Sequence, residues 1–402
     1  MPRAGWVKPE SGRRLSDLVS VGVLTRVFPP GLVDEVVAGC GRTERRHRSL
    51  PARVMAYFSI GMALHSEGSY EDVLGLLTDG LAWSSGAEPV KLPSKSAIFQ
   101  ARARLGAAPV EALFRQVAAP LAGRGAAGSW LAGRRLVAVD GTTLDVADTA
   151  ENAEFFGRAG VNKGEQAAFP QARVLAVAEC GSHAIFDAAV GPYTTGENTL
   201  AGEVVDRLEA GMLVLADRGF CGYPLWRRAA ATGADLLWRA KSTMKPRHLE
   251  TLPDGTWLGE LRPGGNAART AEPLTVRVVD YHLDDGRPND TAYRLLTTLV
   301  DHNEAPAEDL ALAYAQRWEV ESAFDELKSH QRGPRTVLRS KSPDLTLQEI
   351  WGHLCCHFAI RTLMWEAADH AEVDPDRVSF VAALRIARRS IPAARGFPPS
   401  AR

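Results

Sequence analysis

The spacing of hydrophobic and polar positions changes along the chain and divides it into segments with different predicted secondary structure. Up to about residue 128, stretches with helical periodicity alternate with the breakers Pro29-Pro30, Pro51 and Pro93, a pattern that predicts a helical domain. The Gly/Ala-rich stretch 123–128 reads as a linker. Short apolar runs then predict an α/β core, with strands at 135–139, 172–178, 184–190, 212–216 and 235–240 and helices at 200–210 and 224–232.

A different pattern follows residue 241. Turn residues are frequent up to about residue 289, and Leu274, Val276 and Val278 alternate with polar neighbours, so this segment predicts a β-rich insertion. A strand at 293–300, a long helix at 306–330 with proline in its first turn and a helical tail at 345–387 complete the chain. We therefore expect five segments: a helical amino-terminal domain (1–128), the first part of the core (129–240), the insertion (241–291), the second part of the core (292–335) and a helical carboxyl-terminal region (336–402).

Composition limits the class of protein. The 402 residues are 45% hydrophobic and 24% charged, as in an ordinary globular protein. The 47 Lys and Arg residues nearly balance 48 Asp and Glu residues, which excludes a uniformly basic protein but permits a basic face balanced elsewhere. The longest largely apolar run, 54–64, is too short to cross a bilayer. Charged residues interrupt the amino end, unlike a signal peptide, and five scattered cysteines predict a reducing compartment, so we expect a cytoplasmic protein.

Two carboxylates, Asp140 and Asp217, stand at or just past the ends of predicted apolar strands. Ligands of α/β sheets bind at strand ends, so both residues are candidates for one site. The alternative is that each aspartate forms a turn or caps a helix, which is common after a strand.

The predicted long helix carries a second candidate group, Tyr314, Arg317, Glu321 and Lys328. At about 100° per residue, these four side chains share a stripe about 60° wide along about 21 Å of helix. An acid flanked by Tyr, Arg and Lys suits a phosphate chain that runs beside a metal ligand. An exposed face of ion pairs is the alternative.

Clustered arginines in the first segment are typical either of a small helical DNA-binding module or of a solvated helix face. Some lie in the stretch 42–53, and others follow a plausible helix cap at Ser94. The candidates are Arg45, Arg46, Arg48, Arg102 and Arg104.

Three motifs together resemble the signature of the DDE transposases of the insertion-sequence-four family. They are Asp-Gly-Thr from Asp140, Asp-Arg-Gly-Phe from Asp217, and Tyr-x2-Arg-x3-Glu-x6-Lys from Tyr314 to Lys328. The stretches 15–25 and 50–53 are similar to that family's amino-terminal domain, and the resemblance covers roughly residues 15 to 370. It implies an RNase-H-like catalytic core interrupted by a β-rich insertion, with an all-helical, DNA-binding amino-terminal domain and a helical carboxyl-terminal tail.

The resemblance also implies a reaction. Asp140, Asp217 and Glu321 would hold two Mg²⁺ ions, with Mn²⁺ as a possible substitute. Water would attack first at the transposon end, and the freed 3′-hydroxyl would then attack target DNA. Tyr314 and Arg317, together with Lys328, would hold DNA phosphates. The expected partners are double-stranded DNA, both terminal inverted repeats and target, and a second copy of the chain in the DNA complex, at the nucleoid of a bacterium.

Other residues carry open alternatives. Arg218 either contacts phosphate or pairs with a carboxylate. Trp257, in the insertion, either stacks on a flipped base, as an aromatic does in the family, or packs within a strand. His353, Cys356 and His357 lie in one helical stretch without a second ligand pair, which favours core packing over a zinc site.

Two other functions remain open at this point. One is a catalytically inactive, transposase-derived DNA-binding protein, and the other is an RNase-H-like nuclease that cuts without strand transfer. Metal-dependent release of a 3′-hydroxyl end would separate both enzymes from the binding protein, and a strand-transfer product would separate the transposase from the nuclease.

Overall fold

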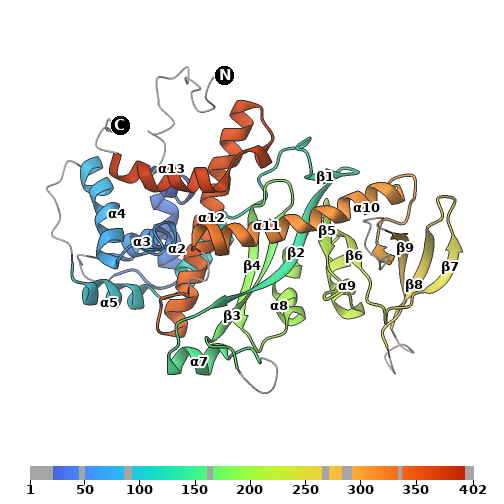
Figure 1. Cartoon of the computed structure of the whole chain (residues 1–402), viewed down its shortest axis with the longest axis horizontal. Coiled ribbons are helices and arrows are strands. Elements are labelled where there is room, and N and C mark those ends of the chain that lie inside the picture. The colour runs from blue at the N-terminus through green and yellow to red at the C-terminus, as the bar shows by residue number, and fades with distance from the viewer. Residues whose placement is uncertain are drawn as a thin grey trace. The chain divides into compact units, whose positions relative to one another are not determined.

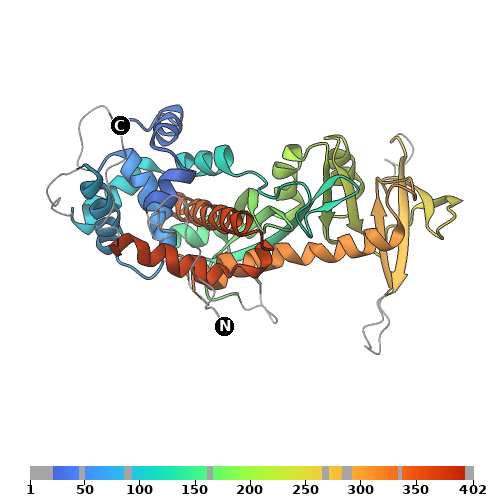
Figure 2. The ribbon, with the colours of Figure 1, turned by 90° about the horizontal axis from the view of Figure 1, so that it is seen from above.

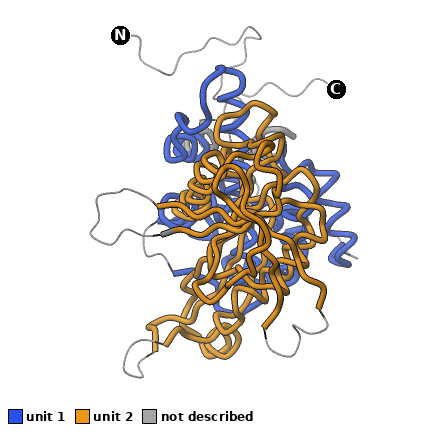
Figure 3. Tube along the Cα trace, turned by 90° about the vertical axis from the view of Figure 1, so that its right-hand side faces the viewer, with its two compact units in different colours: residues 1–118, 326–402 blue, residues 119–325 orange. Residues whose placement is uncertain are grey.

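The computed structural model describes residues 21–44, 50–85, 93–160, 166–264, 271–282, 292–333 and 337–393. The chain divides between two units (Figure 3). The first unit joins residues 1–118 to residues 326–402, and the second comprises residues 119–325. The division into five segments predicted above stays a prediction.

The described part of the first unit is helical. A long helix, α12 (Pro343–Ala371), is buried along most of its length and packs against α3, α6 and α13 (Figure 1). Gly352 of α12 lies against the backbone of Ser59 in α3, where a β-carbon would not fit, so glycine permits this close approach. The other α-helices are α1 (Val21–Val27), α2 (Pro30–Gly39), α3 (Ala52–Leu64), α4 (Tyr70–Ser85), α5 (Lys95–Leu105), α6 (Ala108–Val117) and α13 (Phe380–Ala393).

A mixed sheet forms the centre of the second unit. Its described strands run in the order β4-β3-β2-β5-β6-β10-β9-β8-β7, and β1 pairs with β2. They are β1 (Trp130–Leu131), β2 (Arg134–Asp145), β3 (Gln171–Glu179), β4 (Ile185–Pro192), β5 (Met212–Ala216), β6 (Asp235–Arg239), β7 (Arg247–Thr251), β8 (Trp257–Leu261), β9 (Leu274–His282) and β10 (Ala292–Thr297). The strands predicted from the sequence are therefore confirmed.

Strand directions define the fold class. β2, β3 and β4 are antiparallel, whereas β5 and β6 run parallel to β2. Three antiparallel strands followed by two strands parallel to the first form an RNase-H-like core, as predicted. β7, β8 and β9 lie between β6 and β10 in the sequence and extend the same sheet through antiparallel pairing.

Helices cover the sheet of the second unit. They are α7 (Ala150–Phe156), α8 (Glu197–Val204), α9 (Tyr223–Ala230), α10 (Ala307–Ala315) and α11 (Glu319–Asp325). α11 packs against β2 and β3, and α8 packs against β3 and β4. Figure 2 shows the orange α10–α11 segment along one side of the sheet and the yellow-green α8 on the other.

Two predicted elements differ in the structure. β2 continues to Asp145 rather than ending before Asp140, because its pairing with β3 persists after its pairing with β5 stops at Val139. The helix predicted over 306–330 is not one uninterrupted α-helix. A 3-10 turn (Gln316–Trp318) separates α10 from α11, and a π turn (Glu326–Gln331), which belongs to the first unit, follows α11.

The π turn begins and ends at residues whose side chains are held by α12. Glu326 and Gln331, the first and last residues of the π turn, bond to Arg361 and His353 of α12. π turns are rare and often mark functional positions.

None of the described helices is long and apolar enough to cross a membrane.

Candidate active site

The register of two parallel strands places the candidate aspartates side by side. Val139 of β2 pairs with Ala216 of β5, and Asp140 and Asp217 directly follow this pair. Neighbouring strands lie about 4.8 Å apart, so Asp140 within β2 and Asp217 just past the end of β5 occupy adjacent positions. Asp140 accepts a 2.8 Å hydrogen bond from the Gly141 N–H.

Arg317 connects Asp140 to Glu321. From the 3-10 turn, its guanidinium donates to Asp140 Oδ2 at 3.2 Å and to Glu321 Oε1 at 3.5 Å. Arg317 is 7% exposed, and its Nε has no hydrogen-bond partner in the described part of the chain. A buried donor without an acceptor is costly, so this N–H is suited to meet an oxygen of a ligand.

Tyr314 lies beside the end of β5. Its hydroxyl donates to the Ala216 carbonyl at 3.5 Å, one residue before Asp217. Burial raises the pKa of Tyr314 well above its usual value, with Arg317 opposing the shift and Asp217 adding to it. The phenol is therefore neutral at physiological pH and acts as a hydrogen-bond donor.

The environment of Asp140 is rich in negative charge. Burial raises the pKa of its carboxyl, while the Gly141 N–H and Arg317 lower it, and the carboxylates of Glu321 and Glu197 raise it further. A carboxyl in such surroundings gains from a nearby cation, because the cation compensates both burial and repulsion.

The side chains fit a divalent cation in their chemistry. Asp140, Asp217 and Glu321 offer hard carboxylate oxygens, the ligands that Mg²⁺ prefers. As placed, no three Asp, Glu, His or Cys side chains of the described residues lie close enough to share an ion. Arg317 contacts one oxygen of each of two of the carboxylates, Asp140 and Glu321.

Lys328 lies on the π turn and is half-buried. It belongs to the first unit, whereas Tyr314, Arg317 and Glu321 belong to the second. The predicted 60° stripe assumed one uninterrupted α-helix, and the 3-10 and π turns change the rotation per residue. Tyr314 and Arg317 are buried, while the Glu321 side chain is 45% exposed.

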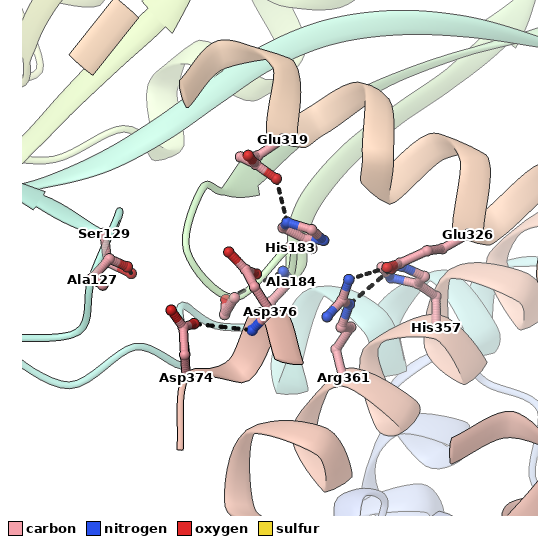
Figure 4. Close-up of polar contacts among 11 residues, drawn as sticks. Ala127, Ser129, His183, Ala184, Glu319, Glu326, His357, Arg361, Asp374 and Asp376 are labelled. Carbon is pink, nitrogen blue, oxygen red and sulfur yellow. Dashed lines mark hydrogen bonds and ion pairs between the residues drawn. The ribbon is translucent and has the colours of Figure 1, made fainter. Parts of the chain in front are cut away.

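A contact between His183 and Glu319 holds α11 to the sheet. His183, in the turn between β3 and β4, has its Nε2 2.5 Å from Glu319 Oε2 (Figure 4). Glu319 precedes Glu321 by two residues, so this contact attaches the helix that carries Glu321 to the sheet. Neither residue is a specified position of the three motifs, so the sequence offered no signal for this contact.

A basic surface begins beside Asp217. A cavity of about 720 Å³ is lined by Arg218 and residues of β6, β9 and β10, and a second of about 1020 Å³ shares Thr243 and Met244 with it. We call the two cavities together the basic trough. Its charged lining residues are the cations Arg218, Arg239, Lys241, Lys245, Arg247, Arg262 and Arg294 and the acids Asp280 and Glu260.

Trp257 lies at the start of β8 and is partly exposed. Its ring stacks on His248 with centroids 5.3 Å apart, and the Arg294 guanidinium lies over it at 5.6 Å. Its Nε1 donates to Asp280 at 3.4 Å. A base that stacks on this ring would have to compete with these neighbours.

The arginine candidates of the first unit differ in placement. Arg45, Arg46 and Arg48 lie outside the described residues. Arg102 is fully buried and donates to Tyr70, Gln348, Ser340 and the Leu345 carbonyl, so the DNA contact predicted for it is replaced by a structural role. Arg104 is exposed near the end of α5, and the predicted cap of this helix is confirmed, since the Ser94 hydroxyl accepts from the Ala97 N–H.

His353, Cys356 and His357 are buried in α12. His353 contacts Gln331, and His357 Nε2 lies 3.1 Å from Glu326 Oε2. Arg361 also pairs with Glu326, and Figure 4 shows both side chains directed at this carboxylate. These α12 residues thus hold the π turn that carries Lys328.

Comparison with known proteins identifies the family. Residues 18–115 match the model of the insertion element 4 transposase amino-terminal domain, and residues 131–359, more than half of the chain, match the transposase DDE domain. The chain belongs to the DDE transposases of the insertion-sequence-four family, and it is a DNA transposase.

Individual proteins are similar to the chain to different degrees. The chain is 28% identical over 373 residues to the transposase InsG for insertion sequence element IS4 of Escherichia coli K12, covering 92% of this chain and 83% of that protein. It is 33% identical over 196 residues to the putative transposase InsZ of the same organism, covering 48% of this chain and 62% of that protein. A solved piggyBac transposase synaptic complex with hairpin DNA aligns with 94% of this chain and 82% of its own, at 12% identity and a TM-score of 0.48.

Membership of this family defines the general requirements of the enzyme. DDE transposases act on DNA and depend on divalent metal ions, so both dependences extend to this chain.

Proposed function

We propose that Asp140, Asp217 and Glu321 are the catalytic carboxylates and that they hold two Mg²⁺ ions. The observation that carries this proposal is the adjacent placement of Asp140 and Asp217, with Arg317 joining Asp140 to Glu321. Ions bound there would activate the attacking oxygen and stabilise the leaving oxygen of a phosphodiester.

The chain's own residues supply orientation and hydrogen bonds. The Nε–H of Arg317, which has no partner among the described residues, is a donor for a phosphate oxygen next to the scissile bond, and the neutral Tyr314 hydroxyl becomes a second donor if it turns away from the Ala216 carbonyl. When a phosphate draws Arg317 away, Asp140 and Glu321 lose their shared partner and become available as ligands. Binding of the DNA end and binding of metal would then favour each other.

Further DNA contacts follow the distribution of positive charge. Arg218 and the basic trough offer a path for a phosphate backbone that leads away from Asp217. Lys328 is a further phosphate contact, and Trp257 a contact to a base. The amino-terminal domain would contact DNA through Arg104 and through Arg45, Arg46 and Arg48, of which the last three lie outside the described residues.

The proposed reaction has two steps. Water hydrolyses the phosphodiester at a terminal inverted repeat and frees a 3′-hydroxyl. This 3′-hydroxyl then attacks a phosphodiester of target DNA, so that a new phosphodiester joins it to the target's 5′-phosphate and the target's own 3′-hydroxyl leaves. We further propose that the protein works as a homodimer on DNA at the bacterial nucleoid, with the five-segment organisation described above.

The decisive test begins with the DNA that flanks the gene. Short inverted repeats bracketing the reading frame would supply the substrate, and a labelled duplex of one repeat with Mg²⁺ becomes the cleavage assay. We expect a nicked product with a 3′-hydroxyl, followed by a joined product when a target plasmid is added.

Two outcomes would contradict the proposal. Cleavage without joining would favour an RNase-H-like nuclease. Tight binding of the repeat without cleavage in either Mg²⁺ or Mn²⁺ would favour a DNA-binding protein derived from a transposase.

A further inference from the structure

A second glutamate lies next to Asp140. Glu197 is the first residue of α8, and its Oε1 accepts from Arg173 of β3 at 2.7 Å. A β-carbon built on Gly141 would lie 3.1 Å from both the carboxyl carbon and Oε1 of Glu197. The Glu197 carboxylate therefore rests against the backbone of the residue that follows Asp140.

This contact accounts for the glycine of the Asp-Gly-Thr motif. Gly141 does not have the positive φ that restricts a position to glycine. Its Cβ position is crowded instead by the Glu197 side chain. Glycine at 141 thus leaves room for a carboxylate beside Asp140.

Two Glu–Arg pairs flank Asp140 through different elements. One is Glu321 with Arg317, and the other is Glu197 with Arg173. Arg173 lies on β3 and also donates to the Tyr193 carbonyl. Arg317 lies against the sheet, where it donates to Asp140 of β2. In both arginines, Nε is buried without a partner in the described part of the chain. Unmet buried donors point to acceptor oxygens that arrive with a ligand.

The charges of the four carboxylates and two arginines around Asp140 do not balance among themselves. Asp140, Asp217, Glu197 and Glu321 bring four negative charges, and Arg173 and Arg317 bring two positive charges, which leaves two negative charges.

We propose that Glu197 is a fourth carboxylate of the metal site, a positioning residue that acts as an outer partner of the ion held by Asp140. This inference rests on the proposed role of Asp140. Arg173 pairs with the Glu197 side chain, and Gly141 leaves room for the carboxylate beside Asp140. The competing explanation is a plain ion pair that fastens α8 to β3.

The test measures Mn²⁺ binding to the full-length protein by isothermal titration and by electron paramagnetic resonance of the free ion. Glu197→Gln keeps the shape but removes the charge, and we expect Mn²⁺ affinity to fall by about 10- to 100-fold, as for other outer partners of metal ligands. Glu203→Gln, an exposed position on the same helix, is the matched control and should leave affinity unchanged.

Arg173→Gln separates the two explanations by the sign of its effect. If Glu197 serves the metal, removing the nearby positive charge of Arg173 should leave Mn²⁺ affinity unchanged or raise it. If Glu197 and Arg173 form only an ion pair, both substitutions should lower affinity alike, or neither should change it, and either result overturns the inference.

Two further variants test the two premises of this inference, the carboxylate site itself and the contact at Gly141. Asp140→Asn should abolish Mn²⁺ binding, and if it has no effect, the proposed carboxylate site itself is wrong rather than the role of Glu197 alone. Gly141→Ala should weaken Mn²⁺ binding in the natural sequence but have little further effect beside Glu197→Ala, since the contact is then gone. An equal loss from Gly141→Ala in both backgrounds would refute the account of Gly141, and circular dichroism checks that each variant is folded.

Discussion

Replacement of Arg317 by glutamine should destabilise the protein in a pH-dependent manner. The substitution removes the guanidinium that donates to Asp140 at 3.2 Å and to Glu321 at 3.5 Å. The Asp140 and Arg317 side chains are 23% and 9% exposed, so Asp140 would keep a largely buried charge with only the Gly141 N–H as donor.

The magnitude follows from this partial burial. Breaking a buried ion pair costs about 3–5 kcal/mol, and a hydrogen bond to a charged group contributes about 1.5–3 kcal/mol. The Glu321 contact is long and exposed and adds little. We therefore expect a loss of about 2–3 kcal/mol at pH 7, which for a unit of this size lowers Tm by about 5–10 °C.

The pH dependence has a definite sign. The pKa of Asp140 lies above its ordinary value mainly because of burial, and Arg317 opposes that shift, so the variant raises the pKa further. A carboxyl with a raised folded-state pKa stabilises the fold when protonated, and this contribution is lost as pH rises through that pKa. As pH falls below that pKa, Asp140 becomes protonated in both proteins, so the difference in Tm should shrink toward acid pH and grow toward neutral pH.

Differential scanning calorimetry between pH 3.5 and pH 7.5 measures this difference. Arg317→Lys, which keeps the charge but loses the forked contact, should fall between the two proteins. Arg227→Gln, at an exposed position of α9 in the same unit, provides the control. An equal loss of Tm by Arg317→Gln at pH 3.5 and at pH 7 would show that Arg317 does not act through ionised carboxylates.

Three other predictions concern catalysis, DNA contact and stability. Asp140→Asn, Asp217→Asn or Glu321→Gln should abolish end cleavage in a gel assay while end binding stays within a few-fold, and loss of binding in all three would make these carboxylates structural. Lys328→Ala should reduce the slope of log affinity against log salt by about one phosphate contact, and an unchanged slope would remove Lys328 from the DNA interface. Arg102→Met should lower the free energy of unfolding by about 2–4 kcal/mol in denaturant titrations, since it strands buried acceptors, with exposed Arg104→Met as the near-neutral control.

Local sequence patterns predicted the strands well. The apolar runs at 172–178, 184–190 and 212–216 correspond to β3, β4 and β5 within two residues, because a buried strand carries its own hydrophobic signal. The same signal ended β2 too early. Its apolar run stops at Val139, whereas its hydrogen bonds to β3 continue through Asp145, and pairing with a neighbour leaves no mark in the strand's own residues.

The directions of side chains around the predicted long helix were predicted less well than the strands. Tyr314 and Arg317 do lie near Asp217 and Asp140, but the sequence did not show the 3-10 and π turns that alter the rotation toward Lys328. The π turn is held by a distant partner, since Arg361 donates to Glu326. Glu197 was overlooked for the same reason, since only the folded chain brings it to Gly141.

The carboxylates of the site are held by two different means. Strand register alone sets Asp140 beside Asp217, so these two depend on the integrity of the sheet. Glu321 lies on α11, which packs on β2 and β3 through its side chains and is joined to the turn before β4 by the contact of His183 with Glu319. A helix that packs on a sheet through side chains can shift with less cost than a strand that is hydrogen-bonded within the sheet. Adjustment of the site on binding DNA and metal is therefore expected in α11, with Asp140 and Asp217 as the fixed reference.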